Sequence, residues 1–317
     1  MRADREPDVT NSTTTNGPHA AKRLPLAVIV LTYNEELNLP ACLESLDGLD
    51  CELFVVDSGS TDGTVSIARQ HGARVLSHPF ESHAKQWRWA LQHVPTSAPW
   101  LLGLDADQRL TPELRQELVQ LFGDGADPPR GVDGFYINRR QVFRGHWIRH
   151  GGYYPKYLLK LFRSRAVYVD DRDLMDHHFY VKGRVAKLRA DLVEANLKED
   201  DIGFWIEKHN HYAVLHAREE LIKRTAGGQL PIQPSLIGGP DQRTLFLKLV
   251  WYRLPLYVRP FLYFVYRYVF RLGFLDGKQG FIFHVLQGFW YRLLVDINLD
   301  QLRANGRGAA TERKLSA

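Results

Sequence analysis

Two carboxylates one residue apart, Asp105 and Asp107, follow the apolar run at residues 100–104. Such a run is typical of a buried strand, and paired acids at its end repel each other and raise each other's pKa. A divalent cation removes this conflict, because Mg²⁺ and Mn²⁺ take oxygen ligands and combine one or two carboxylates with substrate phosphates. Taken alone, the Asp-x-Asp pair fits equally well a solvated loop with a helix-capping aspartate, so the surrounding elements must decide.

Two more junctions between a strand and a polar loop lie upstream. The continuous apolar run at residues 24–32 suits a strand covered on both faces, and it ends in Tyr33-Asn-Glu-Glu, after which leucines recur at roughly helical spacing. Residues 53–56 form a second strand that ends in Asp57, followed by a helix, and residues 74–76 form a third. This alternation predicts an α/β fold, a Rossmann-like, mostly parallel sheet with helices on both faces.

The carboxyl ends of parallel strands share one edge of the sheet, where open α/β folds bind their ligands. Tyr33, Asp57 and Asp107 fall at those ends, which predicts a nucleotide site. The chain has neither a Gly-x-Gly-x-x-Gly turn after the first strand nor a phosphate loop. We therefore expect metal and side chains to hold the phosphates, Asp57 to accept a hydrogen bond from a base or ribose, and Tyr33 to stack on a base.

Three motifs in register over some eighty residues resemble the family-2 glycosyltransferases of the GT-A fold: Val30-Leu-Thr-Tyr-Asn-Glu35, Val55-Val-Asp-Ser-Gly-Ser-Thr-Asp-Gly-Thr64 and Leu104-Asp-Ala-Asp107. The likeness is greatest to bacterial transferases that build lipopolysaccharide core and exopolysaccharide. It continues through His150-Gly-Gly-Tyr-Tyr-Pro155, Leu159-Lys-Leu-Phe-Arg163 and the C-terminal aromatic segment, and so covers most of residues 24–298.

The resemblance implies inverting transfer of a sugar from a nucleotide-sugar donor. The residues that it implies for the nucleoside pocket are Thr32, Tyr33, Glu35 and Asp57. Asp105 and Asp107 become the metal motif, with Asp107 as the expected direct ligand of Mg²⁺ or Mn²⁺ and Asp105 beside the donor. Gln86 matches a donor-side glutamine before the third helix, while Lys85 and Arg88 are candidates for a diphosphate contact only.

An inverting transfer needs a base that takes the proton of the acceptor hydroxyl. Relatives carry it in a short motif some seventy residues after the metal acids, here within residues 170–179. Asp176 is our first candidate and His177 the second, since relatives place a glutamate at the latter position and histidine also acts as a base. The competing interpretation is that Asp176 caps a turn and that the histidines lie on the surface.

Composition divides the chain into four expected parts. Residues 1–23 are polar and lack the apolar core of a secretory signal, so we expect a disordered tail. Residues 24–240 form the catalytic domain, with a nucleotide half at 24–110 and an acceptor half at 111–240. Residues 241–305 form a helical segment, and the chain frays from 306 to 317. The residues expected to be packing thiols are Cys42 and Cys51, and those read as surface or acceptor-site histidines are His209, His211 and His216.

The segment from residue 241 onward is basic and aromatic. It holds 12 Lys and Arg against 5 Asp and Glu, and 15 of the 37 aromatic residues lie between Trp251 and Tyr291. Arginines and prolines interrupt its apolar runs, so we expect amphipathic helices that lie on the cytoplasmic face of the inner membrane without crossing it. Packing as core or as a dimer interface are the alternatives. Nucleic-acid binding is not expected, because no RNA-binding motif is present.

The expected acceptor is accordingly a lipid-linked glycan or a lipopolysaccharide or exopolysaccharide intermediate at the membrane surface. Two other functions compete with sugar transfer. A nucleotidyltransferase would show a glycine-rich basic loop after the first strand, where this chain has the acidic residues 35–36. A non-catalytic nucleotide-sugar-binding module would not need acids at positions 57, 105 and 107.

Overall fold

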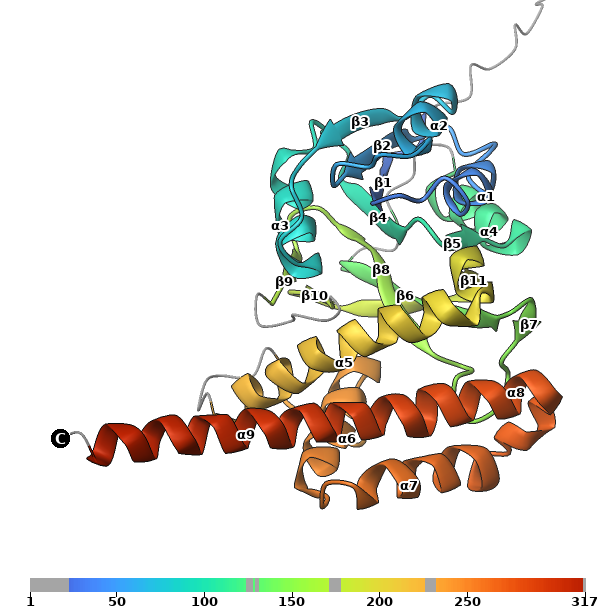
Figure 1. Ribbon diagram of the computed structural model, residues 1–317. Coiled ribbons are helices and arrows are strands. Elements are labelled where there is room, and N and C mark those ends of the chain that lie inside the picture. Colours follow the sequence, from blue (N-terminus) through green and yellow to red (C-terminus); the bar gives the residue numbers. More distant parts are fainter. Residues whose placement is uncertain (1–22, 124–127, 129–130, 171–177, 226–231, 316–317) are drawn as a thin grey trace, which may run out of the picture.

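The computed structural model describes residues 23–123, 128, 131–170, 178–225 and 232–315 (Figure 1). A twisted sheet covered by helices occupies one half of the molecule, and long helices from the later part of the chain form a layer beneath it. The α/β class expected from the alternating elements is confirmed.

Within the described residues, nine strands form one sheet in the spatial order β3-β2-β1-β4-β8-β6-β11-β5, with β7 beside β6. Their bounds are β1 Leu26–Thr32, β2 Glu52–Asp57, β3 Arg74–Ser77, β4 Trp100–Asp105, β5 Gln108–Leu110, β6 Gly134–Phe143, β7 His146–Trp147, β8 Tyr157–Arg163 and β11 Val185–Ala195. A separate antiparallel pair consists of β9 Val167–Val169 and β10 Phe179–Val181.

The four N-terminal strands of the sheet are parallel, and their register fixes the site. Thr32 pairs with Asp57 across β1 and β2, and Leu31 pairs with Asp105 across β1 and β4. The three strand ends therefore lie side by side. The later strands then join in antiparallel fashion, because β8 pairs with β4 on one side and with β6 on the other.

The parallel strands are apolar on both faces because helices cover both. One core lies under helices α1 Leu39–Glu44, α2 Thr64–Gln70 and α4 Pro112–Phe122. The other lies under α3 His83–His93 and the β9–β10 pair. Both thiols are free, as expected, with Cys42 fully buried in the first core. Burial raises its pKa far above the usual thiol range, so this cysteine packs as a small apolar group.

The later helices form a layer of their own, which includes α5 as well as the segment after residue 240 (Figure 1). Their bounds are α5 Ile202–Thr225, α6 Pro240–Arg253, α7 Val258–Val265, α8 Gly277–Phe283 and α9 Tyr291–Leu315. Five-residue and seven-residue π-helical turns at 266–270 and 284–290 extend α7 and join α8 to α9. The helix α9 continues past residue 306, where we expected the chain to fray, and apolar residues of α5 and α9 pack together.

The C-terminal helices contact the sheet domain through the loop after β7. Asp276 accepts hydrogen bonds from the backbone N–H groups of Arg149 and His150, at 3.2 and 2.9 Å, and contacts His150 Nδ1 at 2.7 Å. At Gly151, which has φ +67°, a Cβ atom would lie 2.0 Å from the buried His284 ring. The segment thus packs back on the domain, which was one of the two alternatives to membrane attachment. No helix in the described ranges has the length and hydropathy to span a bilayer.

A buried ion cluster joins three helices of this layer. Arg259 at the start of α7 contacts Glu220 of α5 at 2.9 Å, and it donates through Nε to Asp296 of α9 at 2.7 Å. All three side chains are 0% exposed. Arg224 adds a second cation to Glu220 at 2.6 Å. Removing one partner of such a buried set leaves a charge without compensation.

We therefore predict that Arg259→Met destabilises the protein by about 3–5 kcal/mol, because Glu220 and Asp296 would remain buried and charged. Denaturant unfolding followed by circular dichroism measures this. The matched control is Arg253→Gln, at the exposed end of α6, which should change stability by less than about 0.5 kcal/mol. Equal effects of the two substitutions would contradict the role assigned to the cluster.

Candidate functional site

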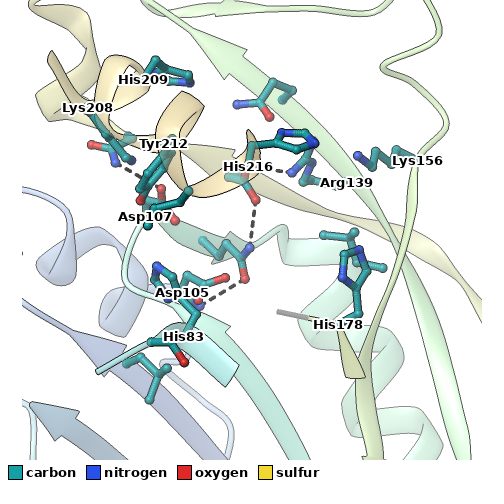
Figure 2. Close-up of a pocket in the computed structure, with 18 of the residues that line it drawn as sticks. His83, Asp105, Asp107, Arg139, Lys156, His178, Lys208, His209, Tyr212 and His216 are labelled. Carbon is teal, nitrogen blue, oxygen red and sulfur yellow. Dashed lines mark hydrogen bonds and ion pairs between the residues drawn. The ribbon is translucent and has the colours of Figure 1, made fainter. Parts of the chain in front are cut away.

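The strand ends open into a cavity of about 1310 Å³. Its walls come from the loops after β1, β2 and β4, from β6 and β8, from α5, and from the C-terminal helices. Figure 2 shows Asp105 and Asp107 beneath the side chains of α5, with His178 and Lys156 on the far wall. One crevice therefore combines the predicted nucleotide half with the acceptor half and the helical layer.

Asp57 is buried and shapes the loop that follows β2. One oxygen accepts from the backbone N–H groups of Gly59 and Ser60, both at 2.9 Å, and the other accepts from the Thr32 hydroxyl at 3.0 Å and from the Ser60 hydroxyl. Thr32 lines the cavity but Asp57 does not. The structure gives Asp57 a loop-forming contact, and a direct contact with a base or ribose stays a prediction.

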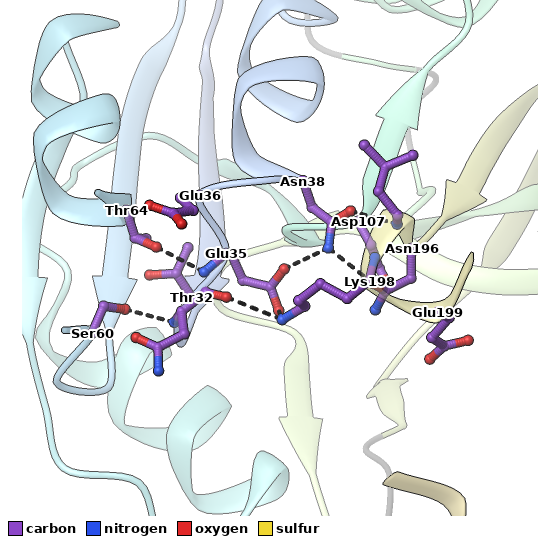
Figure 3. A network of polar contacts seen from close by, with 12 residues as sticks. Thr32, Glu35, Glu36, Asn38, Ser60, Thr64, Asp107, Asn196, Lys198 and Glu199 are labelled. Atoms are coloured by element: carbon purple, nitrogen blue, oxygen red, sulfur yellow. Dashed lines mark hydrogen bonds and ion pairs between the residues drawn. The ribbon is translucent and has the colours of Figure 1, made fainter. Parts of the chain in front are cut away.

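Tyr33 and Glu35 both line the cavity, in different ways. The Tyr33 ring is 57% exposed and is therefore accessible for stacking on a base. Two contacts hold the Glu35 carboxylate in place. Lys198 Nζ lies 2.6 Å from one oxygen, and the Asn38 amide donates to the other at 2.7 Å. Figure 3 shows this network, which links the loop after β1 to the loop after β11.

The same network reaches the second acid of the Asp-x-Asp pair. Asn38 donates to Asn196 Oδ1 at 3.1 Å, and Asn196 Nδ2 donates to Asp107 Oδ2 at 3.2 Å. Asn196 and Lys198 lie in the turn after β11, about 90 residues beyond the acids. Sequence reasoning missed both residues, because no local motif marks them.

The two acids differ in their surroundings. Asp105 is neutralised by the buried Lys160 of β8, with Nζ 2.9 Å from Oδ2. Asp107 forms no ion pair within the described residues. Burial, together with the negative charges of Glu194 and Asp105, raises the pKa of Asp107 to about 8. Asp107 is thus a carboxylate of the crevice that forms no direct ion pair within the described residues, although the charge of Lys208 acts on it.

This arrangement fits a divalent cation. Among the described residues, no cluster of three or more His, Cys, Asp or Glu side chains could hold a metal by itself. Two carboxylates supplemented by substrate phosphates and water are the usual set for Mg²⁺ and Mn²⁺. Such an ion would relieve the repulsion among Asp107, Asp105 and Glu194, and Asp105 is the second carboxylate of the pair.

Gln86 is buried under the loop after β2. Its amide nitrogen donates to Ser58 Oγ at 3.1 Å, and its amide oxygen lies 2.7 Å from His78 Nδ1. Gln86 lines the cavity, as Ser58 does. The two neighbouring cations, Lys85 and Arg88, do not line it, and Lys85 is paired with Glu81 in solvent. Their contact with a diphosphate stays a prediction.

The candidate bases, Asp176 and His177, lie outside the described residues. The nearest described residues on either side, Asp170 and His178, both line the cavity. The assignment of the base therefore stays a prediction, and the choice between the two residues stays open.

The sequence analysis predicted only part of one wall of the cavity, the wall formed by α5. Lys208, His209, Tyr212 and His216 of α5 line it (Figure 2). Of the two readings for these histidines, the surface reading is wrong for His216, which is buried with Nδ1 3.1 Å from the Tyr291 hydroxyl. Burial lowers the pKa of His209 to about 4, with Lys208 and Arg292 adding to the effect, so His209 is neutral near pH 7.

Comparison with known proteins gives a family match over residues 27–183, about half of the chain, to the model described as Glycosyl transferase family 2. The lipopolysaccharide core biosynthesis glycosyltransferase LpsC of Rhizobium meliloti is 27% identical over 293 residues, which cover 89% of this chain and 94% of LpsC. An uncharacterized glycosyltransferase of Rickettsia felis is 34% identical over 97 residues, which cover 31% of this chain and 34% of the relative.

Two solved structures are also similar. The mannosyltransferase PcManGT of Pyrobaculum calidifontis, in complex with GDP-Man and Mn²⁺, is 17% identical with a TM-score of 0.49 and 87% coverage of both chains. Glucosyl-3-phosphoglycerate synthase of Mycobacterium tuberculosis is 27% identical with a TM-score of 0.29, and the match covers 38% of this chain and 45% of that one. The family match, together with a relative aligned over nearly its whole length, shows that the chain is a glycosyltransferase and belongs to glycosyl transferase family 2.

Proposed function

We propose that this glycosyltransferase is an inverting, metal-dependent enzyme that moves a sugar from a nucleotide-sugar donor to a lipid-linked or lipopolysaccharide acceptor at the cytoplasmic face of the inner membrane. The observation that carries the proposal is Asp107, a half-buried carboxylate just beyond the carboxyl end of β4 that forms no ion pair within the described residues. The similarity to LpsC over most of the chain supports the class of acceptor.

Each part of the donor site has a task in this proposal. Thr32, Tyr33 and Glu35 surround the nucleoside, with Lys198 and Asn38 keeping the Glu35 carboxylate in place. Asp107 and Asp105 would hold the divalent cation, whose charge neutralises the leaving nucleoside diphosphate. Lys160 holds Asp105 from the side of β8. The loop organised by Asp57 brings Ser58 to the cavity wall.

The acceptor half supplies the base and excludes water. An acceptor hydroxyl that attacks the anomeric carbon opposite the leaving diphosphate inverts the configuration, and its proton passes to Asp176 or His177. The wall formed by α5 and the C-terminal helices, with Trp205, Tyr212 and Tyr291 among its aromatic residues, surrounds the acceptor. A neutral His209 suits contact with sugar hydroxyls, because it carries no charge that must be desolvated.

The C-terminal helices also offer a surface to the bilayer. Large apolar side chains on α7, α8 and their connections are exposed, most of all Phe270 at 73%. The others are Val258, Phe261, Leu262, Tyr266, Val269, Leu272, Phe274, Leu275 and Phe281. Arg271 and Lys278 are exposed beside them. Figure 1 places α7 on the side of the molecule farthest from the sheet, which suits a surface that rests on anionic headgroups.

The metal assignment predicts that Asp107→Asn lowers transfer, and donor hydrolysis, by at least about 100-fold, since charge neutralisation by a bound metal is worth several kcal/mol. The variant should fold as well as the parent without metal, because the amide has nearly the shape of the carboxyl and the neighbouring acids already disfavour the charged form of Asp107. Hydrolysis of a panel of nucleotide-sugars with Mn²⁺ or EDTA measures this. Near-parental turnover that is equal in Mn²⁺ and EDTA would contradict the assignment.

The base assignment predicts that Asp176→Asn lowers kcat by about 10²–10⁴-fold while donor affinity stays nearly unchanged, because a base acts on the acceptor. The paired variant is His177→Ala, compared in the same assay together with donor binding by calorimetry. Loss of transfer in His177→Ala alone would move the base one residue along the chain. Weakened donor binding in both variants would contradict a base in this segment.

The membrane assignment predicts that the protein floats with anionic liposomes at low salt and less well at high salt, since apolar burial and charge attraction act together. Replacing Phe261, Phe270 and Leu275 by Ser together should abolish flotation without lowering the melting temperature. The control is Val119→Ser, which changes an exposed apolar residue on α4. A full chain that stays in the soluble fraction would instead favour a dimer interface.

A further inference from the structure

Two arginines face the cavity from the C-terminal helices. Arg267 lies in the π-helical turn after α7, and Arg292 lies at the start of α9, with Tyr263 of α7 between them on the same wall. Neither arginine belongs to the predicted nucleotide motifs, and the mechanism proposed above does not use them.

Aromatic rings fix both guanidinium groups in place. The Arg267 guanidinium carbon lies 4.1 Å from the centre of the Tyr153 ring and 4.9 Å from that of Tyr263. The corresponding distances for Arg292 are 5.4 Å to Tyr263 and 5.3 Å to Tyr291. Both arginines also donate to the Tyr263 phenol, and Arg267 donates to that of Tyr153, but a guanidinium carries five N–H donors and these contacts use only some of them.

The charges of the two arginines are not compensated by carboxylates. In the described part of the chain, neither guanidinium lies within ion-pair distance of an acid, whereas Arg259 nearby is enclosed by two. Arg267 Nη1 donates to the Gly152 carbonyl at 3.1 Å. The Nε atoms of Arg267 and Arg292 are both buried without a hydrogen-bond partner in that same part. Unpaired buried donors of this kind are rare in folded proteins.

The local potential is accordingly positive. Burial alone would raise the pKa of the Tyr263 phenol, but the charges of Arg267 and Arg292 outweigh it and lower that pKa below its usual value. Arg292 also acts on His209, whose neighbour in the chain, Lys208, acts on Asp107. The positive wall thus lies within electrostatic range of the residues that border the metal acids.

From this geometry we infer that Arg267 and Arg292 form an anion-binding subsite that holds a phosphate or carboxylate group of the acceptor. The inference rests on the proposed function and extends it, because it makes the acceptor an anionic glycan. Arginine suits the role, since its planar fork matches the two oxygens of either group. It also gives the C-terminal helices a task in substrate recognition in addition to membrane contact.

The test is calorimetric titration of the full chain with methyl phosphate and, separately, with acetate. EDTA is present throughout, so that no metal ion at the Asp-x-Asp pair can bind the probe. We expect Arg267→Gln and Arg292→Gln each to weaken binding by about tenfold, as expected for loss of a charge-assisted hydrogen bond. The control, Arg253→Gln, removes an equal charge outside the cavity and should bind the probes as the parent does.

Melting temperatures and the conservative variants Arg267→Lys and Arg292→Lys separate charge from packing. A folded lysine variant should keep most of the binding that the glutamine variant loses. Stronger binding of methyl phosphate than acetate would indicate a phosphorylated acceptor, and the reverse would indicate a carboxylated one. Binding of neither probe, or equal binding by the parent and the folded glutamine variants, would overturn the inference.

Donor hydrolysis by the parent protein distinguishes failure of the anion subsite from failure of the proposed sugar transfer. If nucleotide-sugars are hydrolysed with Mn²⁺ but the arginine variants bind the probes normally, the subsite is wrong and sugar transfer stands. If no nucleotide-sugar is hydrolysed but the variants lose probe binding, the anion site stands and the proposed donor chemistry fails.

Discussion

The structure depends on one electrostatic constraint, the concentration of negative charge at the carboxyl edge of the parallel strands. Asp105, Asp107 and Glu194 share this edge, and each added negative charge raises the pKa of its neighbours. Two cations from the surrounding strands form ion pairs with these acids, Lys160 with Asp105 and Arg139 with Glu194. Asp107 is left without such a partner within the described residues, and its charge is the one that a bound cation would compensate.

The same constraint explains why segments far apart in the chain meet here. The side chains that neutralise or orient the acids come from β6, β8 and the turn after β11, and the network of Asn38, Asn196 and Lys198 joins that turn to the loop after β1. The parallel half of the sheet therefore does not complete the site by itself. The antiparallel extension of the sheet supplies the counter-charges, and α5 with the C-terminal helices closes the cavity above them.

Arginines serve two opposite purposes in the helical layer. Arg259 forms ion pairs with Glu220 and Asp296 and so links α7 to α5 and α9. Its charge is neutralised by these two carboxylates. Arg267 and Arg292 lie over tyrosine rings, line the cavity and form no ion pair within the described residues, so their charge is available to a ligand. The basic, aromatic composition that suggested membrane contact thus has three uses here: internal fastening, an exposed apolar surface and a positive cavity wall.

The sequence by itself determined the parallel half of the fold and the position of its acids, because an apolar strand followed by a polar loop is a local pattern. Thr32, Tyr33, Glu35, Gln86, Asp105 and Asp107 all line the cavity, and their donor and metal contacts stay predictions. Asp57 does not line it, because hydrogen bonds within its own loop turn its carboxylate inward. Only the tertiary structure decided which cations face the acids, how the helices after residue 240 fold back, and that His216 is buried. Lys160 lies in one of the recognised motifs, but no local pattern predicts its pairing with Asp105, and Lys198, Arg267 and Arg292 lie in no recognised site motif. Their roles arise from pairing across 55 to 163 residues of chain or from packing of distant helices.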